Sequence, residues 1–362
     1  MGKWSVRLLA AVLMVMPLAA CTTAPSGDKG GVSVGGKATA DGPSRLQTVK
    51  DRGKLICGVE GTIPGFSFVD TSGAYSGLDV DTCRAVAAAV FGTAEEIDSK
   101  IEFRNLDSTT RFPALQNGEV DMLARNTTWT ASRDASGGNG LEFAPTTFYD
   151  GQGILAKTSS GVTTLKDMDG KAICVETGTT TELNLATRST ELGITIEEVK
   201  FQDSNATFAA YGEGRCEAIT SDRSQLAAKR TGLPNPEEHV LLDDVLSKEP
   251  LGPVTLNNDS AWYDVVRWVT FGLIQAEEFG ITQANVEEKV TDKSPDVKMF
   301  LGAEGDLGKQ LDLPPDFMVH AIKAAGNYGE IYDRNIGEAL KIERGQNKLW
   351  TDGGLMYSPP FR

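Results

Sequence analysis

The chain has 362 residues, of which 40% are hydrophobic and 23% are charged, close to the composition of an ordinary globular protein. These proportions exclude a largely disordered chain, a collagen-like repeat and a protein with many membrane spans. Lysine and arginine total 35 against 50 acidic residues, and the net charge of −15 repels phosphate backbones, so we expect no nucleic-acid partner. With two histidines, His239 and His320, a histidine-based metal site or triad lacks its usual side chains, and we expect neither a metal nor a cofactor.

Residues 1–20 predict a secretory signal peptide. Two basic residues open it, and the apolar run at 8–16 is roughly half the length that a spanning helix needs. The sequence Leu18-Ala19-Ala20-Cys21 then resembles the lipobox of bacterial lipoproteins, in which the cysteine is acylated and becomes the new N-terminus. We therefore predict an extracytoplasmic protein that contacts the membrane only through a lipid on Cys21. An ordinary signal peptide with an accidental cysteine is the alternative.

Residues 21–44 predict a lipidated N-terminus followed by a flexible tether. Small and polar residues dominate the segment, and they cannot bury enough apolar surface to offset the entropy of ordering. Residues 31–38 nearly match a phosphate-binding loop, but Ala38 stands where a magnesium-binding serine or threonine belongs, and no strand or helix flanks it. We therefore predict no nucleotide site here.

The folded part begins with strands and helices in alternation. In chain order, hydrophobic periodicity predicts strands at 55–59, 101–106 and 120–124 and a helix at 79–91 between the first two strands. A short helix is predicted between the second and third strands. Ser108 or Thr109 caps it, and it ends before Gly118. Such an order implies a parallel sheet covered by helices. Its ligand crevice is expected where strands end and loops begin.

The pattern then starts again, which predicts a second α/β lobe. Its elements are strands at 171–176, 195–201, 216–220 and 240–242 and helices at 179–192, 205–211 and 222–230. Extended segments at 143–156 and 247–255 lie between the two patterns, so the second lobe reads as an insertion. We predict lobe 1 at 45–149 plus 251–362 and lobe 2 at 150–250. Asp259 caps a long helix of lobe 1 whose apolar stripe faces the core.

Four cysteines remain beyond Cys21. An even number in an oxidising compartment suggests two disulfides with three possible pairings. Proximity along the chain favours Cys57 with Cys83 and Cys174 with Cys216, although four reduced core cysteines are an alternative. Zinc is disfavoured because no Cys-x-x-Cys or nearby histidine supplies its usual spacing.

Several motifs are typical of one known family. Gly77-Leu78-Asp79-Val80-Asp81 is followed by Arg84-Ala85-Val86-Ala87. With Thr82 in place of an aliphatic residue, this run resembles the signature of the extracytoplasmic solute-binding proteins, family 3, of amino-acid ABC transporters. The runs at 125–134, 178–182 and 349–354 are similar to the subfamily that binds general L-amino acids, or glutamate, glutamine, aspartate and asparagine. The resemblance implies a type II periplasmic-binding-protein fold, two α/β lobes joined by a two-strand hinge, and the disulfides Cys57–Cys83 and Cys174–Cys216.

The residues suit an amino-acid ligand, which carries one carboxylate and one ammonium. Arg133 is a candidate bidentate donor for the carboxylate, and the helix start at Thr179 and Thr180 offers free N–H groups and hydroxyl donors. Asp222 is a candidate for the ammonium, which the resemblance supports. Each has a plain structural alternative: a solvated arginine, a capped surface helix and an N-cap aspartate. Asn126 and Thr128 are expected to add hydrogen bonds, so the ligand would bridge both lobes.

The ligand's side chain is expected to meet another set of residues. In acidic-amino-acid-binding relatives, the residues matching Arg111 and Ser108 reach the side-chain end, and the resemblance also places Phe66 in the site. Glu60 stands where those relatives have an arginine, which predicts a broad polar preference that includes glutamate and glutamine. The alternative is that Arg111 and Glu60 pair with each other or with solvent.

These observations predict a monomeric lipoprotein that captures a polar L-amino acid and delivers it to an ABC permease with a separate cytoplasmic ATPase. We expect no enzyme activity. An enzyme of the same fold, such as a cyclohexadienyl dehydratase, is the alternative, and it would require a second cleft acid beside Glu60. A sensor ectodomain would require a spanning segment and a signalling domain.

Overall fold

The computed structural model describes residues 44–362 of the chain, so the predicted signal peptide, Cys21 and all of the predicted tether except Ser44 lie outside the described residues. Ser44 caps the first helix, α1 (Arg45–Arg52), by accepting a hydrogen bond from the backbone N–H of Gln47. Within residues 44–362, no helix is both long and apolar enough to cross a membrane.

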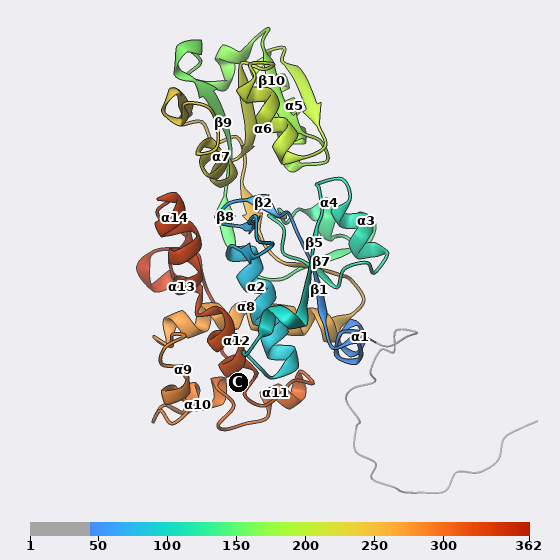
Figure 1. The fold of residues 1–362 in the computed structure, drawn as a ribbon, viewed down its shortest axis with the longest axis vertical. Helices are drawn as coiled ribbons and strands as arrows, with labels where there is room; N and C mark the ends of the chain where they lie inside the picture. Colours follow the sequence, from blue (N-terminus) through green and yellow to red (C-terminus); the bar gives the residue numbers. More distant parts are fainter. Residues whose placement is uncertain (1–43) are drawn as a thin grey trace, which may run out of the picture. The chain divides into compact units, whose positions relative to one another are not determined.

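Lobe 1 is built on a five-stranded sheet (Figure 1). Its order is β5 (Ile101–Asn105), β1 (Leu55–Val59), β6 (Met122–Leu123), β15 (Val254–Leu256) and β7 (Leu141–Phe143). The predicted parallel pairing is confirmed for β1 with β5 and β6. The sheet is nevertheless mixed, because β15 returns from the second half of the chain and runs antiparallel to both neighbours.

Helices cover this sheet and form the largest core. The two long ones are α2 (Leu78–Phe91) and α8 (Ser260–Glu278), and Asp259 caps α8 as predicted by accepting from the N–H of Trp262 at 3.1 Å. The apolar stripe of α8 is buried, which confirms its assignment to the core. The other α-helices of lobe 1 are α3 (Arg111–Gln116), α4 (Ala131–Asp134), α9 (Val286–Lys289), α10 (Pro295–Phe300), α11 (Leu307–Gln310), α12 (Phe317–Ala325), α13 (Tyr328–Tyr332) and α14 (Glu338–Leu340).

Smaller elements complete lobe 1. A three-stranded sheet contains β2 (Thr62–Ile63), β3 (Ser67–Val69) and β4 (Tyr75–Ser76). Short helical turns are η1 (Ile97–Lys100), η5 (Asp333–Gly337), η6 (Gly345–Asn347) and η7 (Trp350–Asp352).

Lobe 2 has its own five-stranded sheet and two hydrophobic clusters. The order is β11 (Glu197–Phe201), β10 (Ala172–Glu176), β12 (Ala218–Asp222), β9 (Gln152–Lys157) and β13 (His239–Leu241). Its helices are α5 (Thr180–Leu192), α6 (Ser204–Gly212) and α7 (Arg223–Arg230), with turns η2 (Thr158–Ser160), η3 (Leu165–Met168) and η4 (Pro236–Glu238). The predicted β-α-β alternation is therefore confirmed in this lobe as well.

Two antiparallel strands join the lobes as a hinge. They are β8 (Phe148–Asp150) and β14 (Glu249–Leu251), and Glu249 lies directly opposite Asp150 in the pair. The chain crosses into lobe 2 through β8 and returns through β14. The exact lobe boundaries at 149/150 and 250/251 remain a prediction.

Each disulfide joins a strand to another segment of the same lobe. Cys57 of β1 bonds Cys83 of α2, and Cys174 of β10 bonds Cys216 just before β12. These are the pairs that the resemblance implied. Each bridge closes a loop inside one lobe and leaves the hinge unconstrained.

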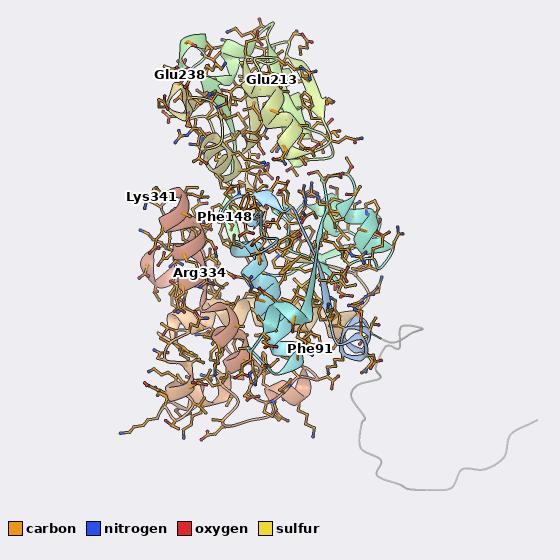
Figure 2. The ribbon with its side chains drawn as sticks, viewed as in Figure 1. Phe91, Phe148, Glu213, Glu238, Arg334 and Lys341 are labelled. Carbon is orange, nitrogen blue, oxygen red and sulfur yellow. A yellow bond between two sulfur atoms is a disulfide. The ribbon has the colours of Figure 1, made fainter. Side chains whose placement is uncertain are left out.

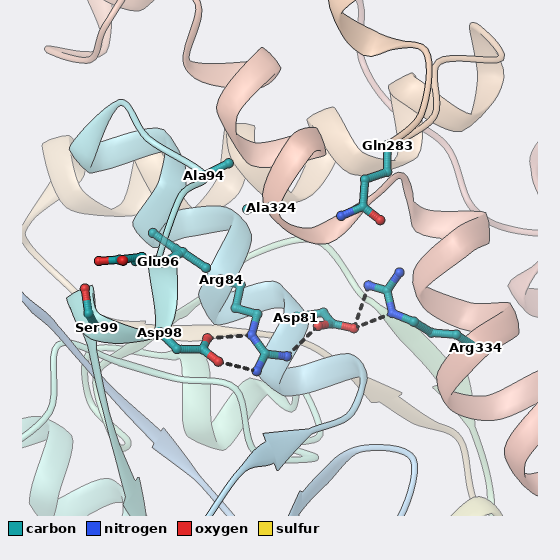
Figure 3. Close-up of a pocket in the computed structure, with 10 residues that line it drawn as sticks. Asp81, Arg84, Ala94, Glu96, Asp98, Ser99, Gln283, Ala324 and Arg334 are labelled. Atoms are coloured by element: carbon teal, nitrogen blue, oxygen red, sulfur yellow. Dashed lines mark hydrogen bonds and ion pairs between the residues drawn. The ribbon is translucent and has the colours of Figure 1, made fainter.

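Asp81 of the signature motif ties the C-terminal segment to α2. Its buried carboxylate accepts from Arg84 at 3.0 Å, from Arg334 at 2.7 Å and from Asn335 at 2.7 Å. Figure 3 shows Arg84 bonded on its other side to Asp98, so the charges form one continuous row. The second acid of the motif therefore has a structural role in holding the C-terminal helices.

Candidate functional site

Polar residues from both lobes meet around a small cavity beside the hinge. Its volume is about 20 Å³. It is lined by Ser108, Arg111, Arg125, Asn126, Thr128, Glu176, Thr179, Thr180, Thr181, Ser221, Asp222 and Gln225. Most of these follow the carboxyl ends of β5, β6, β10 and β12, which is where the sequence predicts the ligand crevice.

A larger pocket of about 690 Å³ lies on lobe 1 near Asp81 (Figure 3). Four of its five charged groups are already engaged with one another in the Asp98–Arg84–Asp81–Arg334 row. Among the described residues, four of the eight buried side-chain polar atoms without a partner belong instead to residues that line the small cavity. The smaller cavity is therefore the candidate ligand site.

Asp222 supplies a buried carboxylate at the end of β12. It precedes α7, but its side chain makes no capping hydrogen bond, and its Oδ1 has no partner within the described residues. Burial raises the pKa of Asp222 well above its usual range, and repulsion from Asp150 and Glu249 adds to the shift, while Arg111 and Arg133 oppose it. Asp222 thus occupies the N-cap position of α7 without capping the helix through its side chain, and the carboxylate is available to a cation.

Asn126 presents a second unpartnered polar group. Its backbone is left-handed, with φ of 41°, and its N–H donates to Asp79 Oδ2 at 3.1 Å. Both side-chain atoms, Oδ1 and Nδ2, are buried in the cavity wall with no partner among the described residues. The amide can therefore both donate to and accept from a ligand.

The start of α5 is capped and still offers free N–H groups. Thr179 Oγ1 accepts from the N–H of Glu182 at 3.1 Å, and the Glu182 carboxylate accepts from the N–H of Gly178 at 2.8 Å. The predicted capping alternative is thus partly correct. Thr180 and Thr181 occupy the first two helical positions, where N–H groups have no intrahelical acceptor, and both line the cavity. This helix end remains suited to an anion.

Arg133 lies in the short helix α4, not in a loop, because Thr130 caps a helical turn there. Its guanidinium is buried, and Nη1 donates to the backbone oxygen of Thr128 at 2.8 Å. Burial lowers the pKa of Arg133 to about 10, while Glu249 and Asp222 oppose the shift. Arg133 is absent from the cavity lining and supports it from behind through Thr128.

Two arginines and one glutamate form the opposite end of the cavity. Arg111 is only 2% exposed, its Nη1 lies 3.4 Å from Thr127 Oγ1, and its Nε has no partner among the described residues. Ser108 Oγ donates to Glu176 Oε1 at 2.5 Å, and Arg125 Nη2 lies 3.5 Å from the same oxygen. Burial and the nearby guanidinium groups of Arg125 and Arg133 lower the pKa of Arg111 well below its usual range. This end offers both a donor and an acceptor.

The short helix beside this end begins later than predicted. Asp107 Oδ1 accepts from the N–H groups of Thr109 and Thr110 at 2.8 Å each, and α3 starts at Arg111. The prediction that Ser108 or Thr109 caps it is wrong, because Thr110 occupies the N-cap position and no side chain caps the helix, while Asp107 organises the turn before it. Ser108 is thereby left to contact Glu176 across the lobes.

Glu60 and Phe66 do not line the cavity. Glu60 accepts from the N–H and hydroxyl of Thr62 at 2.5 and 2.6 Å, and no ion pair joins it to Arg111 within residues 44–362. Phe66 is 1% exposed and packs edge-to-face on Phe148, which begins the hinge strand (Figure 2), with centroids 5.1 Å apart. Phe66 is therefore a core residue, because its ring faces the apolar cluster behind the loop.

Sequence reasoning missed four residues that shape the site: Asp79, Arg125, Glu176 and Glu249. Glu176 ends a predicted strand immediately before the candidate helix start, and Arg125 opens a quoted motif, so their positions alone could have identified them. Asp79 lies inside the signature. No pattern in the sequence around Glu249 indicates its role, because its hydrogen-bond partners are either distant in sequence or outside any of the motifs. No cluster of metal-ligating side chains is found in the part of the chain that the structure describes.

Two α/β lobes on a two-strand hinge, with a buried polar cavity between strand ends, define a type II solute-binding protein. The chain belongs to the bacterial extracellular solute-binding proteins, family 3, which it matches over residues 55–338. Members of this family act outside the cytoplasm, and the chain has the substrate-binding role of an ABC importer.

Individual relatives match over nearly the whole chain. The General L-amino acid-binding periplasmic protein AapJ of Rhizobium johnstonii is 46% identical over 90% of this chain and 95% of its own. The Glutamate/glutamine/aspartate/asparagine-binding protein BztA of Rhodobacter capsulatus is also 46% identical, over 91% and 96%. A solved ABC transporter periplasmic binding protein from Brucella ovis, with glutathione bound, is 46% identical, with a TM-score of 0.84 over 89% of this chain and all of that chain.

Proposed function

We propose that the cavity binds a polar L-amino acid, with glutamine and glutamate among its ligands, and that the protein delivers it to an ABC permease. One observation carries the proposal: Asn126, Asp222 and Arg111 line one cavity, and each has a buried polar atom without a partner among the described residues. Each such atom costs about 1–3 kcal/mol when nothing bonds it. A ligand with an ammonium, a carboxylate and a polar side chain would satisfy these atoms together.

The end of the cavity that contains Arg111 and Glu176 favours a polar side chain. Arg111 supplies a donor and Glu176 an acceptor, which matches the carbonyl and NH₂ of a side-chain amide. A carboxylate would also pair with Arg111, at the cost of repulsion from Glu176. The names of AapJ and BztA, which describe general L-amino acids and the acid–amide set, support the same class. The glutathione-bound relative extends the candidates to γ-glutamyl compounds, whose glutamate end is a free α-amino acid.

Binding requires the lobes to open and close about β8 and β14. The cavity of about 20 Å³ is comparable to the space one water needs, far less than an amino acid occupies. Ser108 and Glu176 come from different lobes and bond directly, so this contact must part for entry. Closure then gains energy only when the ligand satisfies both lobes.

The proposal also includes the attachment of the protein to the membrane, the boundaries of its lobes and its oligomeric state. A lipid on Cys21 would hold the protein at the outer face of the membrane, with residues 22–44 as the tether. The lobe boundaries at 149/150 and 250/251, and a monomeric state, belong to the same proposal.

The test is a calorimetric screen of the common L-amino acids and glutathione, with chemical analysis of each ligand after incubation. We expect stoichiometric binding of glutamine and glutamate and full recovery of unchanged ligand. Conversion of any bound compound would instead favour the cleft enzyme, for which Glu176 and Asp222 would supply acids. Absence of binding across the panel would contradict the proposal.

A further inference from the structure

Glu249 of the hinge strand β14 is the carboxylate that contacts hydroxyls from both lobes. It is 1% exposed, and its Oε2 accepts from Thr128 Oγ1 of lobe 1 at 2.6 Å and from Thr180 Oγ1 of lobe 2 at 2.8 Å. Its Oε1 accepts from Asn184 Nδ2 at 2.9 Å and from the hydroxyl of Ser247. Each oxygen thus has two donors of its own.

These contacts fix the direction in which both threonine hydroxyls point. A hydroxyl has one proton to donate and two lone pairs that accept. Because a carboxylate can only accept hydrogen bonds, the hydroxyl groups of Thr128 and Thr180 both donate their single proton to Glu249. Their oxygens lie 3.4 Å apart and have no proton left for each other or for a ligand. The predicted role of the Thr180 hydroxyl as a donor to the ligand carboxylate is therefore wrong in this arrangement.

The oxygens of these two hydroxyl groups can therefore only accept hydrogen bonds from a ligand in the cavity. Thr128 and Thr180 both line it, beside the unpartnered Oδ1 of Asp222. An α-ammonium group has three N–H donors, and these three oxygens supply three acceptors. The ligand carboxylate is then left to the free N–H groups at the start of α5, which attract an anion without hydroxyl help.

We propose that Glu249 is a positioning residue, which holds the Thr128 and Thr180 hydroxyls as acceptors so that they and Asp222 together bind the ligand's ammonium group. The inference rests on the proposed amino-acid function. Since Thr128 and Thr180 come from different lobes and Glu249 from the hinge, the ammonium site is complete only when the lobes are closed. Recognition of the ammonium is thereby linked to closure.

The test replaces Glu249 by glutamine and measures L-glutamine affinity by calorimetry. With the amide oxygen facing Asn184, the NH₂ group faces the threonines and donates to them, so that their protons turn toward the ligand. Losing hydrogen bonds to a charged group should weaken binding about 10- to 100-fold. Glu102→Gln makes the same chemical change at an exposed ion pair with Arg104 outside the cavity and is the matched control, with affinity expected within about threefold of the native protein.

A double-mutant cycle separates positioning from a general structural effect. In a Thr180→Val background, the loss caused by Glu249→Gln should shrink at least about threefold, because one of the two hydroxyls it acts through is gone. An undiminished loss, or a Glu249→Gln affinity within threefold of native, would overturn the inference. If Glu249→Gln does not fold, Thr180→Val alone decides, since unchanged affinity there would remove the acceptor role.

Ligand binding by the native protein distinguishes a failure of the proposed function from a failure of the positioning role of Glu249. If it binds none of the amino acids tested, the proposed function itself fails. If it binds L-glutamine and the Glu249 and Thr180 variants bind equally well, only the positioning role fails.

Discussion

Asp79 holds the backbone of Asn126 in place, because the buried Oδ2 of Asp79 accepts a hydrogen bond from the Asn126 N–H at 3.1 Å. The backbone of Asn126 is in the left-handed conformation at this point. The first acid of the signature motif thus sets the loop that carries an unpartnered amide into the cavity, while the second, Asp81, anchors the C-terminal segment. One short motif on α2 therefore supports both the site and the outer helices.

This contact predicts a pH dependence of stability. Burial raises the pKa of Asp79 to about 7, above its ordinary value of 3.8, so the folded protein retains a proton that the unfolded chain releases. The contribution of Asp79 to stability is complete below pH 3.8 and is lost as pH rises through 7, with a slope of at most about 1.4 kcal/mol per pH unit.

Urea unfolding at pH 5, 6, 7 and 8 measures this dependence. In Asp79→Asn, which can still accept from Asn126, the decline with pH should be shallower than in the native protein. Asp150, whose pKa burial raises to about 6, contributes equally to both proteins and does not affect the difference. Parallel stability curves would show that Asp79 does not titrate in this range.

Arg111 is expected to read the charge of the ligand's side chain. Its buried guanidinium lacks a partner at Nε, and removing one member of a buried charge pair costs roughly 2–5 kcal/mol. Arg111→Ala should therefore weaken glutamate binding at least about 30-fold and glutamine binding clearly less. Arg104→Ala, at an exposed pair with Glu102, is the control and should change neither affinity. Equal losses for both ligands would show that Arg111 does not distinguish them.

The Cys174–Cys216 bridge should stabilise lobe 2. It joins residues 42 apart, which corresponds to about 4 kcal/mol in the chain-entropy treatment of disulfides. Replacing both cysteines by serine should lower the free energy of unfolding by about that amount. Peptide mapping without reduction should show this bridge and Cys57–Cys83 in the native protein. A bridge that joins the lobes would contradict both the pairing and the layout.

Membrane attachment can be tested apart from ligand binding. Cys21→Ser should release the protein into the soluble fraction, because a lipid on Cys21 is the proposed anchor. The released protein should bind L-glutamine with native affinity, since the site lies in the described residues from Ser108 onward. Loss of binding together with attachment would show that residues 21–44 are more than a tether.

Local sequence patterns predicted most elements, because strands such as β1 are short, continuously buried runs and helices such as α8 bury one face with a clear period. They also placed Asp222 and the start of α5 at strand ends. They failed where a long-range partner decides the role. Glu249 matters through Thr128, 121 residues away in sequence, and Phe66 turned out to pack on Phe148. Neither contact leaves a trace in spacing or composition.

The Asp222→Asn variant tests the central claim, that the cavity binds an amino acid through its ammonium group. Burial and two neighbouring acids raise the pKa of Asp222, so the ionised form destabilises the folded protein, and the amide should raise the melting temperature near pH 7. The same change removes the ammonium's charged partner.

The decisive measurement is therefore a calorimetric titration of native and Asp222→Asn protein with L-glutamine at pH 7. We expect stoichiometric binding by the native protein and at least about 30-fold weaker binding by the variant, despite its higher melting temperature. Equal affinity in the two proteins would contradict the claim, because the cavity's one unpartnered carboxylate oxygen among the described residues would then play no part in holding the ligand.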